Sequence, residues 1–505
     1  MNHHFFKKKW GQNFLRNNHI IEKIIDQIDN DSYVIEVGPG DGALTKRILS
    51  KVKKLVAIEI DSDLIEKLNN EIKDEKFKLI NYDVMKIDFN SFINEHFQSA
   101  KKITLVSNLP YNISSQVLFK IYENYDLFDK AILMLQKEVA DKLNANPSDE
   151  NYSNITVATK TICSYQEIAF VGRNNFFPVP NVDSKVFKLT FNKNLDGIDL
   201  NKFLNYLKKI FLHRRKTLKN NLKNFHINDE KIDNLLNIKK LNKTIRPEEL
   251  NEKNHLSLFF LLNDFNLIKS NAKITLALSV GKKINDYHEI LGIYYPIFNL
   301  YDEIFIKESN TNKVNFYPSQ IYNSTIDKIL KKNLTEKKYE IFVIKNIPLG
   351  SGMAGGSSNA WFFLDYINNK NSLNLSKNEI ENILKPISTD SLFFINNSLS
   401  LVSGNGEILE EIDTKLKLDV ELFFSEINSS TKKVYEEFDR ITNDPKINND
   451  KINLIVNSLK NDDLKNVKNH LFNDLSLAFK NLYNLNINWK DKKLTGSGST
   501  LFVVK

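Results

Sequence analysis

One stretch decides the fold of the first half of the chain: Val34-Ile35-Glu36-Val37-Gly38-Pro39-Gly40-Asp41-Gly42. A short apolar run ends in closely spaced glycines, and a helical pattern begins at about Ala43. Glycine lets a backbone turn tightly and approach a ligand closely, so this strand-to-helix turn is typical of a nucleoside cofactor site. Dinucleotide and S-adenosylmethionine sites share the layout, and the loop alone does not distinguish them.

The pattern around this loop alternates apolar runs with helical stretches. Apolar runs occupy residues 33–37, 55–60, 77–80 and 103–106, with helical patterns from about Ala43 and Leu64. This alternation predicts a parallel α/β sheet. Residues 201–262 show helical spacing and predict a small all-helical lobe. Beyond Ser270, apolar runs at 273–280, 303–306, 341–345 and 501–504 predict a second set of strands.

Composition limits the class of protein. The 505 residues, with 41% hydrophobic and 26% charged side chains, predict a multidomain globular protein. We find neither an apolar run long enough to span a membrane nor a signal peptide, and the single Cys163 fits a reducing cytoplasm. Residues 1–269 carry a net charge of +7 and residues 270–505 one of +1, which favours a polyanion partner for the first half.

Acidic and amide side chains follow the predicted strands. Glu59 ends the second strand, where a carboxylate can accept ribose hydroxyls, and Asp83 follows the third, where it can meet an adenine amine. After the fourth strand, Pro110 holds Leu109 extended and directs the Leu109 carbonyl and the Asn108 amide oxygen into the crevice. Two acceptors there can bind an exocyclic amino group.

Aromatic residues accompany this element. Tyr111 and Phe176 are predicted to sandwich a base that has left its stack. The catalytic candidates are therefore Asn108, Leu109, Pro110, Tyr111 and Phe176. The alternative is structural: Asn108 caps a helix and the aromatic rings belong to the core.

Several ordered motifs give the first half a resemblance to a known family. They are Lys9-Trp10-Gly11-Gln12-Asn13-Phe14-Leu15, the loop at 36–42, Asn108 to Ser115, Gln136-Lys137-Glu138, and residues 178–184 and 211–222. Together they resemble the bacterial dimethyladenosine transferases of 16S rRNA, the ribosomal RNA small subunit methyltransferase A family, over residues 1–265. Two departures are Trp10, where the family usually has Phe, and Asp41, where it often has a small or apolar residue.

This resemblance implies a Rossmann-like class I methyltransferase followed by an RNA-binding helical lobe. It implies dimethylation of N6 on two adjacent adenosines in the hairpin loop near the 3′ end of 16S rRNA in the 30S subunit. It also implies contacts with S-adenosylmethionine from Gln12, Asn13, Leu15, Gly38, Gly40, Glu59, Asp83 and Asn108.

A basic helix is predicted from residue 204 to residue 225. It carries eight basic side chains around an apolar stripe, and four of them are our candidates for RNA contact: Arg214, Arg215, Lys216 and Lys219. Contact with phosphates would make affinity fall with salt. The alternative is a merely solvated face.

A second glycine-rich loop, residues 348–359, follows a strand and opens a helix. Its exposed backbone amides and the positive helix end predict a phosphate cradle without a Walker lysine; the alternative is a flexible linker. The ATP-binding candidates are Pro348, Gly350, Gly352, Gly355, Gly356, Ser357 and Ser358.

Two charged residues can complete a phosphoryl-transfer site. Lys273 begins a strand, and Asp390 precedes an apolar run at 391–394 that we predict to be a strand. Beside a triphosphate they can orient and deprotonate a substrate hydroxyl, while Mg²⁺ offsets phosphate charge. The single cysteine excludes a cysteine metal cluster, and no protein metal ligand is proposed.

The second half is similar to the kinase superfamily that includes galactokinase, homoserine kinase and mevalonate kinase. The loops at 348–359 and 494–499, with Lys273 and Asp390, give this resemblance, which implies a two-lobed α+β GHMP-type kinase. Residues 286–289, 355–360 and 473–475 are most similar to 4-diphosphocytidyl-2-C-methyl-D-erythritol kinase, in which Tyr287 and His288 would hold the cytosine.

Departures from that pattern are Asn271, Thr275 and a missing glycine before Tyr287. The chain also stops at Lys505, where the family continues with a helix and a strand, so the kinase half is expected to be truncated.

We therefore predict a methyltransferase domain at 1–195, a helical lobe at 196–268 and a kinase domain at 269–505, in the cytoplasm. The alternative function is an rRNA-binding assembly factor joined to an inactive kinase-like scaffold.

Overall fold

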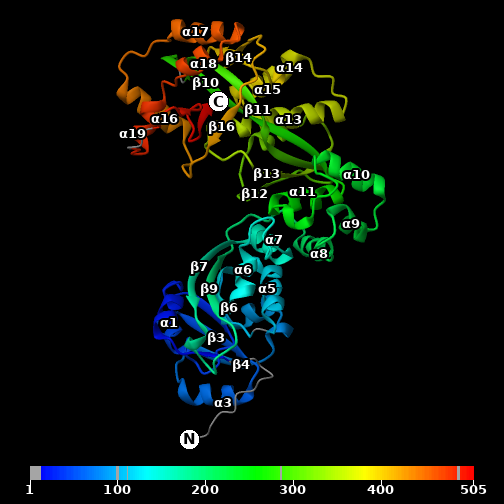
Figure 1. Ribbon diagram of the computed structural model, residues 1–505, viewed down its shortest axis with the longest axis vertical. Coiled ribbons are helices and arrows are strands. Elements are labelled where there is room, and N and C mark those ends of the chain that lie inside the picture. The colour runs from blue at the N-terminus through cyan, green and yellow to red at the C-terminus, as the bar shows by residue number, and fades with distance from the viewer. Residues whose placement is uncertain (1–12, 98–101, 111, 285–286, 486–488) are drawn as a thin grey trace. The chain divides into compact units, whose positions relative to one another are not determined.

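The computed structural model describes residues 13–97, 102–110, 112–284, 287–485 and 489–505 (Figure 1). The chain divides into two units, residues 1–259 and 260–505. The division falls within α11 (Glu252–Leu262), ahead of the boundary expected at residue 269. Phe260 stacks on Phe342 with ring centroids 4.3 Å apart, so the end of this helix packs with the second unit.

A seven-stranded sheet forms the first unit, in the order β4-β3-β2-β5-β6-β9-β7. Its strands are β2 (Tyr33–Val37), β3 (Lys54–Glu59), β4 (Phe77–Asn81), β5 (Ile103–Asn108), β6 (Phe128–Gln136), β7 (Ser164–Val171) and β9 (Ser184–Thr190). Strands β2 to β6 are parallel, and β9 is antiparallel to both β6 and β7. The predicted parallel sheet is confirmed, and its strands β2, β3 and β5 are almost entirely buried, whereas β4 at the edge is not.

The order of these strands fixes where a ligand can bind. From β2 the chain proceeds outward through β3 and β4, then returns to place β5 on the other side of β2. The strand order therefore reverses between β2 and β5, and open α/β sheets bind ligands at the carboxyl ends of the strands beside such a point. The helices of this region are α1 (Asn18–Ile25), α2 (Thr45–Ile48), α3 (Ser62–Glu71), α4 (Phe89–His96), α5 (Ser114–Glu123), α6 (Lys137–Leu143) and α7 (Asn154–Ile162).

The helical lobe contains α8 (Leu200–Ile210), α9 (Leu218–Leu222), α10 (Asp229–Ile238) and the start of α11. The predicted continuous basic helix is wrong, because a turn separates α8 from α9. Thr217 caps α9 by accepting from Asn220 N, and buried Asn221 Nδ2 donates to the carbonyls of His213 and Lys216. These polar side chains satisfy backbone groups that a helix through the turn would pair internally.

The second unit contains two separate sheets. One has the order β12-β13-β11-β14-β15, with β10 also paired to β11, and the other has the order β16-β18-β17. The strands are β10 (Asn266–Ile284), β11 (Tyr287–Ser309), β12 (Lys313–Tyr317), β13 (Lys338–Ile344), β14 (Ser400–Ser403), β15 (Ile408–Glu411), β16 (Val420–Phe423), β17 (Lys493–Leu494) and β18 (Leu501–Val504). The predicted mixture of sheet and helix in this half is confirmed.

Helices pack against both sheets of the second unit. They are α12 (Thr325–Leu330), α13 (Gly355–Lys370), α14 (Lys377–Leu384), α15 (Phe393–Asn396), α16 (Thr431–Ile441), α17 (Asn449–Lys460), α18 (Leu464–His470) and α19 (Ser476–Leu482). The strand predicted at 391–394 is wrong: a 3₁₀ turn, η7 (Thr389–Leu392), leads into α15, since a short buried apolar run has no periodicity that separates strand from helix. Among the described residues, we find no helix with the length and hydropathy of a membrane span.

Candidate functional site

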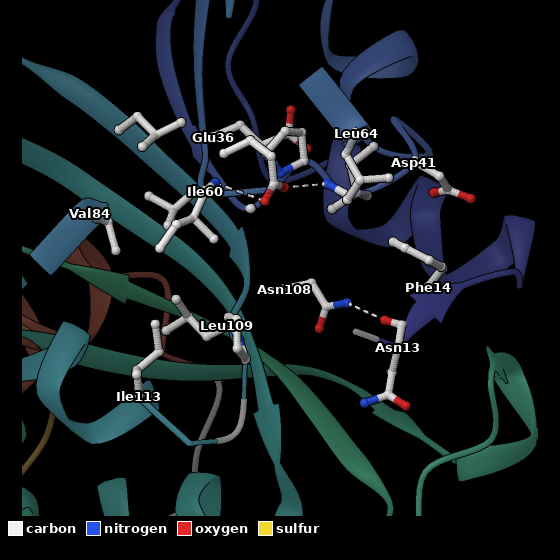
Figure 2. A pocket seen from close by; sticks show the side chains of 18 of the residues that line it. Asn13, Phe14, Glu36, Asp41, Ile60, Leu64, Val84, Asn108, Leu109 and Ile113 are labelled. Atoms are coloured by element: carbon white, nitrogen blue, oxygen red, sulfur yellow. Dashed lines mark hydrogen bonds between the residues drawn. The ribbon is translucent and has the colours of Figure 1, made fainter. Parts of the chain in front are cut away.

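A cavity of about 480 Å³ lies at the carboxyl ends of β2, β3, β4 and β5 (Figure 2). The loop after β2 forms one side, with Gly38 at φ +70° and Gly40 at φ +61°. A Cβ atom on Gly40 would lie 2.8 Å from the Phe14 ring, so only glycine permits this packing. A Cβ atom on Gly38 would meet no atom within 4 Å. Gly38 and Gly40 both line the cavity.

Glu59 connects the loops on either side of the cavity. It ends β3, and its carboxylate accepts from Ile60 N at 2.9 Å, Asp61 N at 3.0 Å and Gly40 N at 3.3 Å. Burial raises the pKa of Glu59, and these three amide donors oppose the rise. Oε2, which accepts from Gly40, keeps a lone pair that a ribose hydroxyl can use.

Asp83 lies two residues beyond β4 and begins the 3₁₀ turn η2 (Val84–Lys86). Its Oδ1 accepts from Met85 N at 2.9 Å, so one carboxylate oxygen caps the turn. Asp83 lines the cavity together with Val84 and Met85. The Asp83 carboxylate is therefore in the cavity, where it was expected to meet the amino group of an adenine.

Asn108 is the last residue of β5, and its amide has a fixed direction. Its Nδ2 donates to the Asn13 carbonyl at 3.0 Å, which leaves Oδ1 as an acceptor beside the cavity (Figure 2). Leu109 N donates to Met134 O at 3.2 Å, while the Pro110 carbonyl accepts from Ile113 N, so the backbone directly after Asn108 is held in place. Tyr111 lies outside the described residues.

The N-terminal strand β1 (Phe14–Leu15) forms another wall of the cavity and pairs with β8 (Phe176–Phe177). Asn13 and Leu15, which were expected to contact S-adenosylmethionine, both line the cavity. Phe176, however, is 2% exposed and packs in the core beside Leu15, whereas Phe177 is 55% exposed. Successive strand side chains point to opposite faces, so Phe177 replaces Phe176 as the candidate for stacking on a base.

One acidic residue of the cavity was not predicted. Glu36 lies within β2, is buried, and has an Oε2 atom without a hydrogen-bond partner among the described residues. Burial raises the pKa of Glu36 to about 8. The signal was present in the sequence, because a carboxylate inside the apolar run Val34-Ile35-Glu36-Val37 needs a reason to be there.

We expect Glu36→Gln to change how stability depends on pH. Between the unfolded pKa near 4.5 and the folded pKa of about 8, the folded state holds one more proton, so its stability falls as pH rises, by about 1.4 kcal/mol per pH unit. Neutral Gln removes this loss and raises the unfolding temperature at pH 8 more than at pH 5.5.

Calorimetry of the full chain measures the unfolding temperature. The unfolding transition to follow is the one that S-adenosylhomocysteine shifts, because that ligand is expected to bind the half that contains Glu36. The control is Glu66→Gln at an exposed position of α3. This substitution should change the unfolding temperature by the same amount at pH 5.5 and at pH 8. Equal effects from the Glu36 and Glu66 variants would show that Glu36 is not held protonated.

The basic candidates in the helical lobe have different surroundings. Arg214 Nε pairs with Glu248, and its Nη2 donates to the Asp149 carbonyl at 3.1 Å. Lys219 pairs with Asp233 at 2.6 Å. Arg215 and Lys216 are exposed in the turn between α8 and α9 and have no ion pair among the described residues. The last two are therefore the better candidates for contact with phosphates.

In the second unit, the glycine-rich loop packs against a second loop at 495–499. Gly350 and Gly352 have positive φ, and side chains on them would overlap Ser429 and Thr495. The Gly350 carbonyl accepts from Ser499 N at 3.1 Å. Pro348 lies just before this packed segment, and Gly355 and Gly356 begin α13. The loop is thus a rigid strand-to-helix turn rather than a flexible linker.

The two serines at the start of α13 have unequal positions. Ser357 Oγ lies 2.7 Å from Ser388 Oγ and is partly exposed. Ser358 is buried: its hydroxyl donates to Asn271 O at 2.7 Å, and its backbone N to the Ala354 carbonyl. The prediction that Ser358 contacts ATP is therefore wrong, because its hydrogen bonds attach α13 to β10.

Lys273 and Asp390 come together in the structure. Lys273 Nζ lies 3.8 Å from Asp390 Oδ2, 2.9 Å from Thr275 Oγ1 and 3.6 Å from the centre of the Tyr294 ring. Tyr294 also donates to Asp390 Oδ1 at 3.2 Å. Burial lowers the pKa of Lys273, although Asp390 opposes this. The aspartate is the more accessible partner, with a side chain 33% exposed.

Tyr287 and His288 begin β11, and the residue before them, Asp286, lies outside the described residues. Tyr287 is exposed, whereas His288 is buried, lies 2.6 Å from Asp439 Oδ1 through Nε2, and packs on Tyr435 with ring centroids 5.0 Å apart. Tyr435, which we did not predict, adds an aromatic face to this pair. Its position in an amphipathic helix gave no sign of this.

A family model described as "Ribosomal RNA adenine dimethylase" matches residues 3–263. The chain belongs to the ribosomal RNA adenine dimethylase family. "Ribosomal RNA small subunit methyltransferase A" of Mycoplasma mobile is 41% identical over 262 residues, which cover 52% of this chain and 99% of that protein. The protein of the same name from Mesoplasma florum is 41% identical over 247 residues, covering 48% and 92%.

Part of the remaining sequence of this dimethylase-family chain matches a second family. A model described as "GHMP kinases N terminal domain" matches residues 320–395, so the chain joins a methyltransferase half to a GHMP kinase-like half, as predicted. These two families imply S-adenosylmethionine and ATP as cosubstrates.

Solved structures similar to each half exist. A dimethyladenosine transferase from Plasmodium falciparum is 28% identical, with a TM-score of 0.42, covering 50% of this chain and 97% of that one. A 4-(cytidine 5'-diphospho)-2C-methyl-D-erythritol kinase is 20% identical, with a TM-score of 0.39, covering 47% and 90%.

No group of three or more potential metal ligands occurs among the residues the structure describes.

Proposed function

We propose that the first half dimethylates N6 of two adjacent adenosines in the hairpin loop near the 3′ end of 16S rRNA, using S-adenosylmethionine. The observation that carries this proposal is the fixed Asn108 amide, whose Nδ2 is held by Asn13 O so that Oδ1 is available at the cavity. The 41% identity to ribosomal RNA small subunit methyltransferase A over nearly its whole length supports the choice of RNA.

The adenine amino group is a poor nucleophile because its lone pair is delocalised into the ring. Asn108 Oδ1 and the Leu109 carbonyl would accept its two hydrogens and favour a pyramidal nitrogen, whose lone pair is then free to attack. Bound S-adenosylmethionine supplies a methyl group on a positively charged sulfur. Glu59 would hold the ribose hydroxyls, Asp83 would face the cosubstrate's adenine, and Phe177 would stack on the target base.

Labelling of rRNA tests this function. The full chain, incubated with tritiated S-adenosylmethionine and 30S particles that lack the modification, should transfer tritium to 16S rRNA. Fully methylated 30S particles are the matched control and should accept none. Equal labelling of both particles, or labelling of neither while the chain binds them, would contradict the proposal.

We expect Arg215→Ala combined with Lys216→Ala to weaken 30S binding about tenfold at low salt. Each lost phosphate contact also removes about one unit from the slope of log affinity against log salt, so the slope should become less steep by about two.

Filtration binding over a range of KCl concentrations measures this effect. A matched control, Lys73→Ala with Lys76→Ala, removes the same charge from exposed positions between α3 and β4. If both double variants lose affinity equally, the effect is one of net charge and these two residues are not contacts.

For the second half we propose ATP-dependent phosphorylation of 4-diphosphocytidyl-2-C-methyl-D-erythritol, a step toward isoprenoid precursors. Asp390 would accept the proton of the substrate hydroxyl, and Lys273 would orient that hydroxyl and the transferred group. ATP supplies the phosphoryl group, with Mg²⁺ offsetting its charge. Tyr287 and His288, beside Tyr435, would receive the cytosine. The 3.8 Å approach of Lys273 to Asp390 is the observation that supports phosphoryl transfer here.

The alternative is an rRNA-binding assembly factor joined to an inactive kinase-like scaffold. An assembly factor needs the RNA contacts but not the Asn108 amide, and a scaffold needs the fold but not the buried Lys273. ADP release by the full chain with ATP, Mg²⁺ and the diphosphocytidyl alcohol separates kinase from scaffold. Substrate-independent ADP release, or none, would contradict the proposed substrate.

A further inference from the structure

The segment 13–17 lies along one side of the methyltransferase cavity. Asn13, Phe14 and Leu15 line the cavity, and Figure 2 shows Phe14 and Asp41 on the same side of it. The segment is held at its first residue, where the Asn13 carbonyl accepts from Asn108 Nδ2. At its other end, Arg16 N donates to the Asn175 carbonyl at 2.8 Å, and Asn17 Nδ2 donates to Asn175 Oδ1 at 2.7 Å.

An ion pair connects this segment to the glycine-rich loop. Arg16 Nη1 lies 2.6 Å from Asp41 Oδ2, with the arginine side chain 51% and the aspartate 11% exposed. The guanidinium also lies 5.7 Å from the centre of the Phe14 ring, and that ring packs on Gly40 so closely that a Cβ atom there would overlap it. The Arg16–Asp41 ion pair therefore lies beside the Phe14 ring, which itself packs on the glycine-rich loop.

The strand β1 itself is short. It has two residues, which pair with the two residues of β8. Phe14 lines the cavity and packs on Gly40, so movement of β1 away from the glycine-rich loop would widen the cavity. The Arg16–Asp41 pair is a charged connection that opposes that movement. Asp41 is also one of the departures noted in the sequence, since the related family often has a small or apolar residue at this position.

We propose that Arg16 and Asp41 are positioning residues that slow the release of S-adenosylmethionine and S-adenosylhomocysteine by holding segment 13–17 against the glycine-rich loop. The inference rests on the proposed cosubstrate site. Neither side chain takes part in methyl transfer; both act through the placement of Phe14, while the Asn13 carbonyl stays held by Asn108. The pair should thus affect cosubstrate dissociation and KM, and leave kcat at saturating cosubstrate unchanged.

The test is the dissociation rate of S-adenosylhomocysteine from the full chain, measured by stopped-flow displacement. Asp41→Asn and Arg16→Gln should each release it about three- to tenfold faster, because a partly exposed ion pair contributes modestly. The double variant should match the single variants rather than multiply them. The swapped pair, Arg16→Asp with Asp41→Arg, should recover much of the slow release, which a merely structural loss would not allow.

Glu71→Gln is the control, since it breaks the exposed Lys46–Glu71 ion pair in the same unit. Its release rate should equal that of the unchanged chain. The proposal is overturned if the Arg16 and Asp41 variants release the ligand at the unchanged rate, or if their effects multiply in the double variant. If S-adenosylhomocysteine does not bind the unchanged chain at all, the proposed cosubstrate site fails and the inference fails with it.

Discussion

Asn108→Ala is expected to lower the rate of methyl transfer to 16S rRNA by about 10²- to 10³-fold, the usual cost of losing one preorganised polar group at a reacting centre. Two effects combine. The variant loses the Oδ1 acceptor beside the cavity, and it loses the bond from Nδ2 to the Asn13 carbonyl, so the cavity wall is less well held. Single-turnover labelling with excess protein measures the chemical step.

Binding of the 30S particle should change little, because Asn108 is distant in sequence from the exposed basic turn and contributes no charge. Exposed Asn90→Ala, in α4, is the matched control and should transfer methyl groups at the unchanged rate. If Asn108→Ala retains full activity, the amide has no part in accepting the amino hydrogens and the proposed mechanism is wrong.

Asp390→Asn is expected to reduce phosphoryl transfer by about 10²- to 10⁴-fold, the range for losing a general base. The amide keeps the shape of the carboxylate and can still accept from Tyr294, so the fold should persist. It cannot take the proton of a substrate hydroxyl. Coupled measurement of ADP at saturating ATP and diphosphocytidyl alcohol gives kcat, and fluorescence titration gives nucleotide affinity.

Lys273→Met provides a second test at the same site. It removes the ammonium group that lies against both Asp390 and the Tyr294 ring, and its loss of kcat should overlap that of Asp390→Asn rather than multiply it. Exposed Asp413→Asn is the charge-matched control. Unchanged ADP release in both site variants would support the inactive scaffold, if the release seen were independent of the alcohol.

The sequence was informative where local rules were strong. The first parallel strands were predicted within two residues of their ends because continuous apolar runs were bounded by turns, and the glycine pattern after Val37 placed the cavity correctly. Lys273 and Asp390, more than a hundred residues apart, were predicted to share a site from the chemistry of phosphoryl transfer, and the kinase resemblance agreed with this. No local pattern could have paired them.

The errors have particular physical causes. The basic helix failed because Thr217 and Asn221 satisfy backbone groups in a turn, and charge periodicity does not register such bonds. Phe176 and Phe177 are chemically alike, so which ring is exposed depends on the register with β1, where Leu15 lies opposite Phe176. Ser358 lies within the predicted phosphate loop, but its tertiary bond to Asn271 decides its role.

The central claim is tested most directly by locating the methyl groups. After incubation of the full chain with unmodified 30S particles and S-adenosylmethionine, the 3′ fragment of 16S rRNA is digested and sequenced by mass spectrometry. We expect two adjacent N6,N6-dimethyladenosines in the hairpin loop with the unchanged chain, and unmodified adenosines at both positions with Asn108→Ala. Methyl groups on another base or another atom, or identical dimethylation by the variant, would contradict the account.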